Sequence, residues 1–394
     1  MKIEQVDFFY LSMPEVRDIG DGSQDALLVR VRGGGYTGWG ECEASPLVSI
    51  AGWCCPMSHS ACKPVKASVL GQTLNEPTDI ERINRLVREQ SLDLAQADHT
   101  LSGIDIALWD LLGKRRGEPV YALLGNDRAH PKLPYASQLF GNTPEETYTK
   151  AKRAIEQGYH AVKFGRGPYG RGNAAVDAAH IAAAREGLGD ETILLVDAGT
   201  VWDDDVALAR QRLSALREHR VHWLEEPFVG GAVHAYGQLA PEAAPVALAG
   251  GEGARHFHDA RHLIDYGRVG YIQIDAGRIG GITTARRVAR YAASRGVRYV
   301  NHTFTTHLAL SASLQPYADL ADHELCEYPV EQSELARTLT HQSLARDADG
   351  RIRLPDCPGL GLEPDPAVIR KYPVHTQITV AGRVVYTTPD PDEL

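Results

Sequence analysis

Seven polar residues that can carry chemistry end short apolar runs in the second half of the chain. The runs are YHAVK, ILLVD, VHWLE, PVALAGGE, YIQID, RYVNH and HELCE, and they end at Lys163, Asp197, Glu225, Glu252, Asp275, His302 and Glu327. After Asp197 the steps are 28, 27, 23, 27 and 25 residues, about one strand plus one helix each, which predicts parallel strands. A parallel barrel brings the carboxyl ends of its strands to one mouth, so these side chains should converge there.

Three successive runs end on carboxylates, at Asp197, Glu225 and Glu252. These side chains can meet around one cation, and oxygen ligands without Cys or His favour Mg²⁺ over zinc. The alternative for any single acid is a helix cap or a pair with an arginine. That alternative explains three acids in register much less well.

The next two runs end on Asp275 and His302. A carboxylate on one imidazole nitrogen fixes the tautomer and raises the basicity of the other nitrogen, which is the arrangement of a general base. Either residue alone is equally compatible with a hydrogen-bonded structural group. Their joint placement at adjacent strand ends favours the catalytic interpretation.

The elements that must position these residues are an α/β repeat and a different N-terminal region. Strand-like runs (IEQVDFFYL and DALLVRVRGGGYTGWGE) open the chain, a helical pattern covers residues 101–113, and the turn-rich NDRAHPKLP marks a boundary near residue 130. We predict an N-terminal α+β domain over residues 1–130, the barrel over 131–335, and a C-terminal segment over 336–394 that packs back on the first domain.

Composition excludes several other classes of protein. The net charge is −10 and basic residues are scattered, which is not the footprint of a nucleic-acid-binding protein. The first residues lack the pattern of a signal peptide, and no apolar run approaches the ~20 residues that cross a membrane. Six cysteines show no C-x-x-C spacing, which indicates reduced thiols, with disulfides as the lesser alternative. We therefore expect a cytoplasmic protein without nucleic-acid or membrane partners.

A glycine motif offers a competing function. Gly165, Gly167 and Gly170 have the G-x-G-x-x-G spacing of a dinucleotide-binding fingerprint and follow an apolar run. That fingerprint needs an acidic residue ~20 positions further on, and Asp197 lies 32 residues after Gly165. The motif therefore fits a strand-to-helix loop at the barrel mouth better than a nicotinamide dehydrogenase.

Several motifs together resemble a known family. VDAG, WLEEP and GGE, with the spacings above, resemble the metal-binding set of the enolase superfamily, and residues 100–125 (TLSGIDIALWDLLGKRRGEPVYALLG) resemble a signature of its mandelate racemase/muconate lactonizing branch. The resemblance runs from GWGE near Gly40 to the PGLGLE tail. It implies a modified (β/α)₇β TIM barrel with an α+β capping domain, and Mg²⁺ that stabilises an enediolate. We also expect a homo-oligomer. Gly199 departs from the D-x-N pattern of the family.

The resemblance also implies roles for the strand-end residues. Asp197, Glu225 and Glu252 would bind Mg²⁺, and Asp275 with His302 would form the catalytic dyad of the mandelate racemase subgroup. Glu327 would hold a substrate oxygen, or else form an ion pair under the barrel mouth.

The family usually has K-x-K at the end of the second barrel strand. Lys163 matches the first lysine and would bind or neutralise the substrate carboxylate, whereas Gly165 stands at the second. Racemisation needs a base on each face, but dehydration needs only one. His302 could then act first as base and later as acid.

Members of this subgroup often act on acid sugars, so we expect a small anionic substrate, an aldonate or an aldarate. Arg166 would bind its carboxylate or else lie on the surface, and Asn301, Thr303 and His307 are candidates for its hydroxyls. Specificity in the family comes from two loops of the capping domain, here residues 16–23 and 45–59. They supply the further candidates Arg17, Asp18, Asp21 and Trp53.

These inferences predict a Mg²⁺-dependent acid-sugar dehydratase that gives a 2-keto-3-deoxy acid. An epimerase or a lactone cycloisomerase would keep the fold and change the reaction. A non-catalytic metal- or ligand-binding descendant is the alternative of another class.

Overall fold

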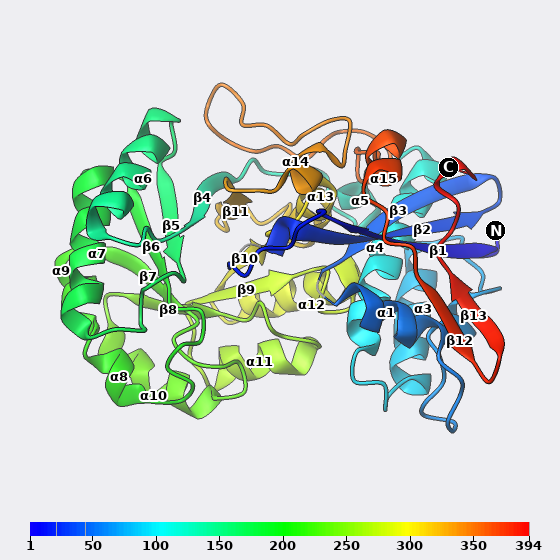
Figure 1. The fold of residues 1–394 in the computed structure, drawn as a ribbon, viewed down its shortest axis with the longest axis horizontal. Coiled ribbons are helices and arrows are strands. Elements are labelled where there is room, and N and C mark those ends of the chain that lie inside the picture. The colour runs from blue at the N-terminus through cyan, green and yellow to red at the C-terminus, as the bar shows by residue number, and fades with distance from the viewer. Residues whose placement is uncertain (21, 44, 394) are drawn as a thin grey trace.

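The computed structural model describes residues 1–20, 22–43 and 45–393, and they form a capping domain beside a barrel (Figure 1). Figure 1 shows the barrel strands and helices in green and yellow and the capping domain mostly in blue and cyan. Both chain termini lie at the edge of the capping domain (Figure 1).

A three-stranded antiparallel sheet forms the centre of the capping domain. Its strands, in spatial order, are β1 (Gln5–Ser12), β2 (Asp25–Gly33) and β3 (Tyr36–Cys42). The β2–β3 turn contains Gly34 and Gly35, with φ of 57° and 80°, a region that glycine enters without steric cost. The glycine-rich hairpin in the sequence therefore forms as a tight turn.

Five helices complete the capping domain. They are α1 (Pro46–Cys54), α2 (Lys66–Val69), α3 (Pro77–Gln90), α4 (Ala97–Arg116) and α5 (Val120–Leu123). Helix α4 packs against β3 so closely that a Cβ on Gly38 or Gly40 would lie 2.2 Å from a carbonyl oxygen of the helix. The glycines of the GYTGWG stretch thus permit the close approach of helix and sheet.

Eight parallel strands form the barrel. In chain order they are β4 (Leu133–Leu139), β5 (Ala161–Gly165), β6 (Ile193–Asp197), β7 (Val221–Glu225), β8 (Ala247–Gly250), β9 (Tyr271–Asp275), β10 (Arg298–His302) and β11 (Leu325–Pro329). The hydrogen-bonded order is β10-β9-β8-β7-β6-β5-β4-β11, so every strand from β4 to β10 pairs with its chain neighbour. The predicted fold class, a modified barrel with an α+β capping domain, is confirmed.

Helices follow the strands and surround the barrel (Figure 1). They are α6 (Pro144–Glu156), α7 (Ala174–Leu188), α8 (Val206–Arg210), α9 (Leu213–Glu218), α10 (Val233–Ala243), α11 (Phe257–Asp265), α12 (Gly281–Ser294) and α13 (His307–Leu314). Helices α6, α7 and α13 begin after Thr143, Asn173 and Thr306, whose side chains accept hydrogen bonds from backbone N–H groups of the first turn. Within the described part of the chain, no helix is both long enough and apolar enough to cross a membrane.

The side chain of Asn301 bridges the two ends of the barrel sheet. Its Oδ1 accepts a hydrogen bond from Glu327 N at 3.0 Å, and its Nδ2 lies 3.4 Å from Glu327 O. The amide therefore takes the place of a backbone pair between β10 and β11. Tyr317 Oη also donates to Asn301 Oδ1 at 2.9 Å, and Asn301 is fully buried.

The C-terminal segment returns to the capping domain. It contains α14 (Glu334–Thr338), α15 (Pro366–Lys371), β12 (Gln377–Val380), β13 (Arg383–Thr387) and a short 3₁₀ helix at Pro391–Glu393. Elsewhere in the chain, short 3₁₀ helices occur at Gly22–Gln24 and Gln315–Tyr317. Leu360 N donates to Asp110 Oδ1 at 2.8 Å, and Tyr386 Oη donates to Phe8 O at 2.7 Å. The tail thus contacts both α4 and β1.

Candidate active site

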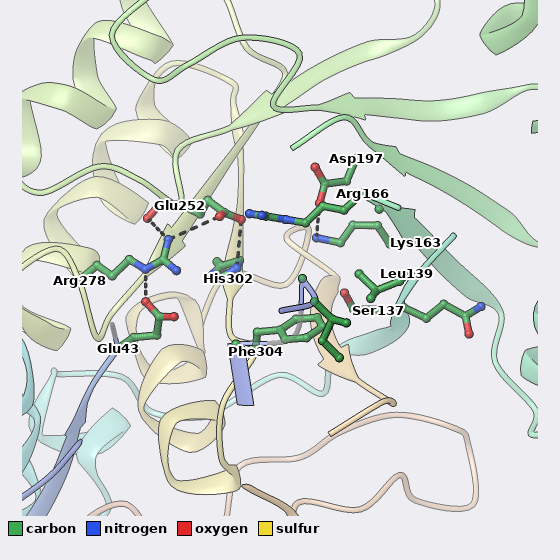
Figure 2. Close-up of a pocket in the computed structure, with 15 residues that line it drawn as sticks. Glu43, Ser137, Leu139, Lys163, Arg166, Asp197, Glu252, Arg278, His302 and Phe304 are labelled. Carbon is green, nitrogen blue, oxygen red and sulfur yellow. Dashed lines mark hydrogen bonds and ion pairs between the residues drawn. The ribbon is translucent and has the colours of Figure 1, made fainter. Parts of the chain in front are cut away.

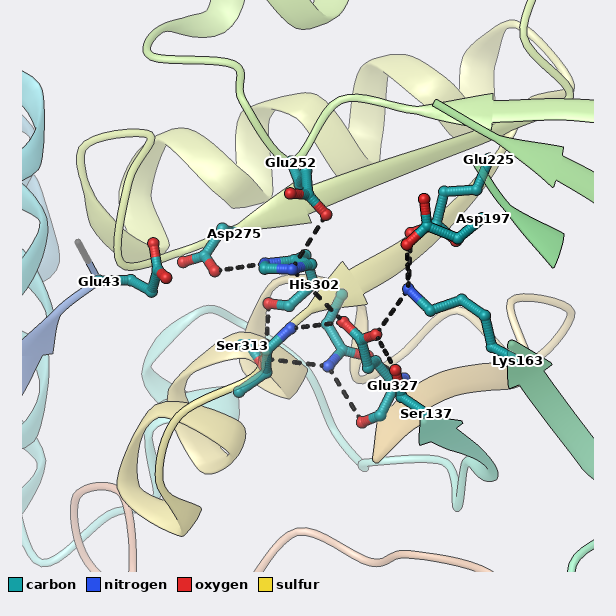
Figure 3. Close-up of polar contacts among 12 residues, drawn as sticks. Glu43, Ser137, Lys163, Asp197, Glu225, Glu252, Asp275, His302, Ser313 and Glu327 are labelled. Carbon is teal, nitrogen blue, oxygen red and sulfur yellow. Dashed lines mark hydrogen bonds and ion pairs between the residues drawn. The ribbon is translucent and has the colours of Figure 1, made fainter. Parts of the chain in front are cut away.

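The strand register brings the predicted residues together at the barrel mouth. Asp197 lies opposite Glu225 on β7 and opposite Gly165 on β5, while His302 lies opposite Asp275. All of these residues end their strands. Figure 3 shows the acidic side chains of the site, with those of Lys163 and His302, turned toward a common centre. The acids are Asp197, Glu225, Glu252, Asp275 and Glu327.

A cavity of about 230 Å³ opens above these strand ends. The capping domain contributes to its wall, so the cavity lies where the two domains meet (Figure 2). The lining residues are Ile19, Gly20, Gly22, Glu43, Ser137, Gln138, Leu139, Lys163, Gly165, Arg166, Asp197, Glu252, Arg278, His302 and Phe304. Most of these side chains are polar, which suits a hydroxylated anionic ligand.

Asp275 and His302 form the predicted dyad. Asp275 Oδ2 lies 2.7 Å from His302 Nδ1, and Asp275 Oδ1 accepts a hydrogen bond from Gly277 N at 2.6 Å. His302 Nε2 lies 3.0 Å from Glu252 Oε2. Burial opposes the charged imidazolium, but the nearby carboxylates of Glu252 and Glu327 outweigh burial and raise the pKa of His302 well above its ordinary value.

Lys163 is held by carboxylates. Its Nζ lies 2.6 Å from Glu225 Oε1, 2.8 Å from Glu327 Oε1 and 3.8 Å from Asp197 Oδ2 (Figure 3). Burial opposes the charge on Lys163, yet these acids, Glu225 first, raise its pKa well above the ordinary value. The geometry makes Lys163 a fixed positive charge on the β5 side of the mouth.

The three predicted metal ligands have counter-charges within the protein. Glu225 contacts Lys163 and accepts a hydrogen bond from Trp223 Nε1 at 3.1 Å, and Glu252 contacts His302. Burial raises the pKa of Asp197, and repulsion from Glu252 acts in the same direction. In this arrangement no group of three or more His, Cys, Asp or Glu side chains among the described residues is preset around a cation.

The donor set nevertheless fits Mg²⁺ in its chemistry. Asp197, Glu225 and Glu252 offer only carboxylate oxygens, they end or follow three adjacent strands, and Asp197 and Glu252 line the cavity. Hard oxygen donors of this kind are those that Mg²⁺ prefers. The metal assignment of these three residues stays a prediction.

Two family descriptions match the chain. The mandelate racemase / muconate lactonizing enzyme N-terminal domain matches residues 19–125, and the enolase C-terminal domain-like family matches residues 146–368. This chain belongs to the enolase superfamily. Members of the superfamily generally use Mg²⁺.

Relatives of this chain within the enolase superfamily are named for different reactions. L-talarate/galactarate dehydratase of Salmonella typhimurium is 30% identical over 310 residues, which are 77% of this chain and 72% of the relative. D-galactarolactone cycloisomerase of Agrobacterium fabrum is 29% identical over 350 residues, 84% of this chain and 86% of the relative. A crystal structure from Rhodobacter sphaeroides, described as a predicted mandelate racemase, is 56% identical, covers 99% of this chain and 100% of its own, and has a TM-score of 0.95.

Two charged lining residues of this enolase-superfamily site, Glu43 and Arg278, were not singled out from the sequence. Arg278 contacts the carboxylates of both Glu43 and Glu252, and Glu43 comes from the capping domain (Figure 2). A signal for Arg278 was present, because it lies three residues after the strand-end Asp275. No sequence motif indicated Glu43, which lines the cavity only because the capping domain contacts the barrel.

Two predicted substrate contacts need correction, and for Glu327 the structure shows the ion pair that was the alternative. The side-chain amide of Asn301 bonds to the backbone of Glu327 between β10 and β11, and Asn301 does not line the cavity. Trp53 is 6% exposed and packs with its ring centroid 5.5 Å from that of Phe8, so it belongs to the core of the capping domain. Glu327 is fully buried beneath the cavity, where it accepts hydrogen bonds from Ser137 Oγ and Thr303 N, both at 2.8 Å, and pairs with Lys163.

The two loops of the capping domain contribute unequally. The loop at residues 16–23 supplies Ile19, Gly20 and Gly22 to the cavity wall, whereas Arg17 and Asp18 are exposed and do not line it. Asp21 lies outside the described residues. No described residue of 45–59 lines the cavity, because much of that segment folds into α1.

Thr303 and His307 are also buried and do not line the cavity. Thr303 Oγ1 donates to a neighbouring oxygen, so its hydroxyl already has a partner within the protein. Arg166 does line the cavity, and Figure 2 shows its side chain extending toward Glu252.

Proposed function

We propose that this enolase-superfamily chain is a Mg²⁺-dependent dehydratase of an acid sugar, an aldonate or aldarate, that gives a 2-keto-3-deoxy acid. The observation that carries the proposal is the asymmetry of the barrel mouth. His302 faces the cavity on one side, while Gly165 on β5 has no side chain and Lys163 is held by two carboxylates. Elimination of water needs one proton-transferring group, whereas inversion at the α-carbon needs one on each face.

His302 has the geometry of a base that later acts as an acid. Asp275 holds Nδ1, so Nε2, which lies 3.0 Å from Glu252 Oε2, is the nitrogen that would exchange protons with the substrate, as a base in its neutral form. Nε2 removes the proton from the carbon next to the carboxylate, and the electron pair of that C–H bond moves toward the carboxylate.

The electron pair then returns to form a double bond to C3 as the C3 hydroxyl leaves. The leaving hydroxyl takes the proton from His302 Nε2 and departs as water. This step restores the neutral imidazole. The resulting enol loses its hydroxyl proton to solvent and gains a solvent proton at C3, which gives the 2-keto-3-deoxy acid.

The other side of the mouth binds negative charge. Asp197, Glu225 and Glu252 would hold Mg²⁺, which when bound supplies positive charge that acidifies the proton next to the substrate carboxylate. Arg166 lines the cavity, its side chain is exposed, and its positive charge acts to lower the pKa of Asp197. Its planar guanidinium suits a carboxylate of the substrate.

The relatives favour the same substrate class and keep one second candidate open. The Salmonella relative is named as a dehydratase of talarate and galactarate, which are diacids. The Agrobacterium relative, which covers a larger share of this chain, is named as a cycloisomerase of a lactone of galactarate. A cycloisomerase also needs one base, so the single histidine is compatible with both reactions.

A screen of aldonates and aldarates with Mg²⁺ tests the proposal. Formation of a 2-keto acid, abolished by a chelator, is the expected result. In deuterated water the dehydrated product should carry deuterium at C3, whereas epimerisation places deuterium at C2 without loss of water. Conversion of a sugar lactone without loss of water would support the cycloisomerase instead. Mg²⁺ binding without turnover of any acid sugar would overturn the proposal.

A further inference from the structure

Arg278 joins two carboxylates that come from different domains. It lies in the loop between β9 and α12, and its Nε contacts Glu43 Oε2. Its Nη1 lies 3.5 Å from Glu252 Oε1 and 3.4 Å from Glu252 O. The side chains of Arg278 and Glu43 are 20% and 8% exposed, so water screens this pair less than a surface pair.

Glu43 is fixed to the barrel by its backbone as well. Its N–H donates to Gly277 O at 3.1 Å, and a Cβ on Gly277 would lie 2.8 Å from both Cβ and N of Glu43. A glycine at position 277 therefore permits the capping domain to come this close. The Glu43 carboxylate also faces the first capping loop, because a Cβ on Gly22 would lie 3.7 Å from Glu43 Oε1.

We infer that Glu43 and Arg278 are positioning residues through which the capping domain orients Glu252 beside His302. The inference rests on the proposed function, since it assigns the pair a role in the same proton transfers. Glu252 Oε2 contacts His302 Nε2 at 3.0 Å, and Arg278 holds the other oxygen of the same carboxylate. Glu43 of the capping domain and the base are thereby connected through the side chains of Arg278 and Glu252 (Figure 2).

An arginine suits this task better than a lysine. Its planar fork presents two N–H groups to two separate carboxylates, whereas an ammonium is a single point of charge. Removing one partner of a buried ion pair also leaves the other charge uncompensated. The orientation of Glu252 should therefore depend on the shape of residue 278 as well as on its charge.

The test compares Glu43→Gln, Arg278→Met, Arg278→Lys and the double variant Glu43→Gln/Arg278→Met. We expect Arg278→Met to lower kcat about 100-fold with a smaller change in KM, as is typical for residues that orient a metal ligand. Arg278→Lys should restore part of kcat. The double variant should lose no more than Arg278→Met, because the residues act as one unit.

A second readout needs neither substrate nor metal. Amide hydrogen exchange of residues 248–254 should become faster in Arg278→Met, because Glu252 loses contacts from its side chain and its carbonyl. Thr283→Val is the matched control. It removes the acceptor of the 2.9 Å hydrogen bond from Trp109 Nε1, another contact between the domains that lies outside the cavity.

Unchanged exchange over residues 248–254 in Arg278→Met would overturn the inference whether or not an acid sugar is turned over. Additive losses in the double variant, or an equal loss in Thr283→Val, would also overturn it. Failure to find any substrate, with faster exchange in Arg278→Met, would count against the proposed function and leave the positioning of Glu252 supported.

Discussion

The two sides of the barrel mouth use the same strand-end positions for different purposes. On the β9–β10 side, Asp275 and His302 form a pair whose second nitrogen faces an acid at the cavity. On the β5–β6 side, Lys163 forms ion pairs with Glu225 and Glu327, and Gly165 has no side chain. One side can exchange a proton, whereas the other holds a fixed charge.

This difference shows why position alone does not assign a catalytic role. Lys163 lies two residues before the end of β5, His302 ends β10, and both line the cavity. Both are held by carboxylates, and the position of those carboxylates separates them. Lys163 contacts Glu225 and Glu327 at 2.6 and 2.8 Å, and neither acid lines the cavity. His302 Nε2 contacts Glu252 at 3.0 Å, and Glu252 does line it. The comparison predicts different consequences for variants on the two sides.

The largest effect is expected for His302→Asn, which removes the base and keeps a polar side chain of similar reach. Turnover and exchange of the substrate α-proton should fall by about 10³-fold, and Mg²⁺ binding should persist. Product formation and deuterium exchange by NMR, with calorimetry for Mg²⁺, measure the three quantities. His258→Asn, at an exposed histidine, is the control. Retained α-proton exchange would show that another residue is the base and would contradict the proposed difference between the two sides of the mouth.

Lys163→Met should mainly reduce stability. It leaves Glu225 and Glu327 buried without their shared counter-charge, which should lower the free energy of unfolding by about 3–5 kcal/mol. Urea denaturation with a chelator present measures the change. The exposed pair of Lys150 with Glu331, at 2.8 Å, provides a control, since Lys150→Met should cost less than about 1 kcal/mol. Equal effects of the two variants would refute the fixed-charge role.

Gly165→Ala tests whether Asp197 needs the space that the absent side chain of Gly165 leaves. Its Cβ would lie 2.8 Å from Asp197 Oδ2, so the carboxylate must move. We expect a loss of about 1–3 kcal/mol in stability and weaker Mg²⁺ binding. Gly172→Ala, in the same loop with its nearest neighbour 3.9 Å away, should be neutral. Normal Mg²⁺ binding in Gly165→Ala would show that Asp197 does not need this space.

The smallest effect is expected for Arg166→Met. Loss of an exposed guanidinium that contacts a substrate carboxylate should raise KM about tenfold and change kcat less. Steady-state kinetics with the acid sugar found in the screen measure both constants. Arg171→Met changes an arginine of the same loop that does not line the cavity and should leave KM unchanged. A loss confined to kcat would argue against a binding role for Arg166.

Much of the site could be predicted from the sequence because strand ends are local features. A short apolar run followed by a helical pattern locates the end of its strand to within two residues, and parallel strands share one mouth. Lys163, Glu252 and Glu327 were predicted as strand ends, but β5, β8 and β11 end at Gly165, Gly250 and Pro329. The dyad of Asp275 and His302 and the absence of a side chain at Gly165 follow from this reasoning. The resemblance of residues 100–125 to a family signature added the fold class, which the structure confirms.

The choice of partner for each side chain required the tertiary structure. Asn301 was expected to contact substrate and instead closes the seam between β10 and β11. Trp53 was expected to contact substrate from a loop of the capping domain and instead packs in the core of that domain. Both errors have one cause: a polar or aromatic residue in the right segment can face either the cavity or the interior, and packing selects between them.

The sequence by itself determined the order of strands, the mouth at which the acids and the histidine gather, and the absence of a side chain at Gly165. Only the tertiary structure decided that Lys163 pairs with acids from two other strands and that Glu43 reaches Arg278 across 235 positions of chain. The physical reason is the separation along the chain over which each feature is set. Periodicity fixes where a strand ends, whereas ion pairs and domain contacts depend on distances that exist only after the chain has folded.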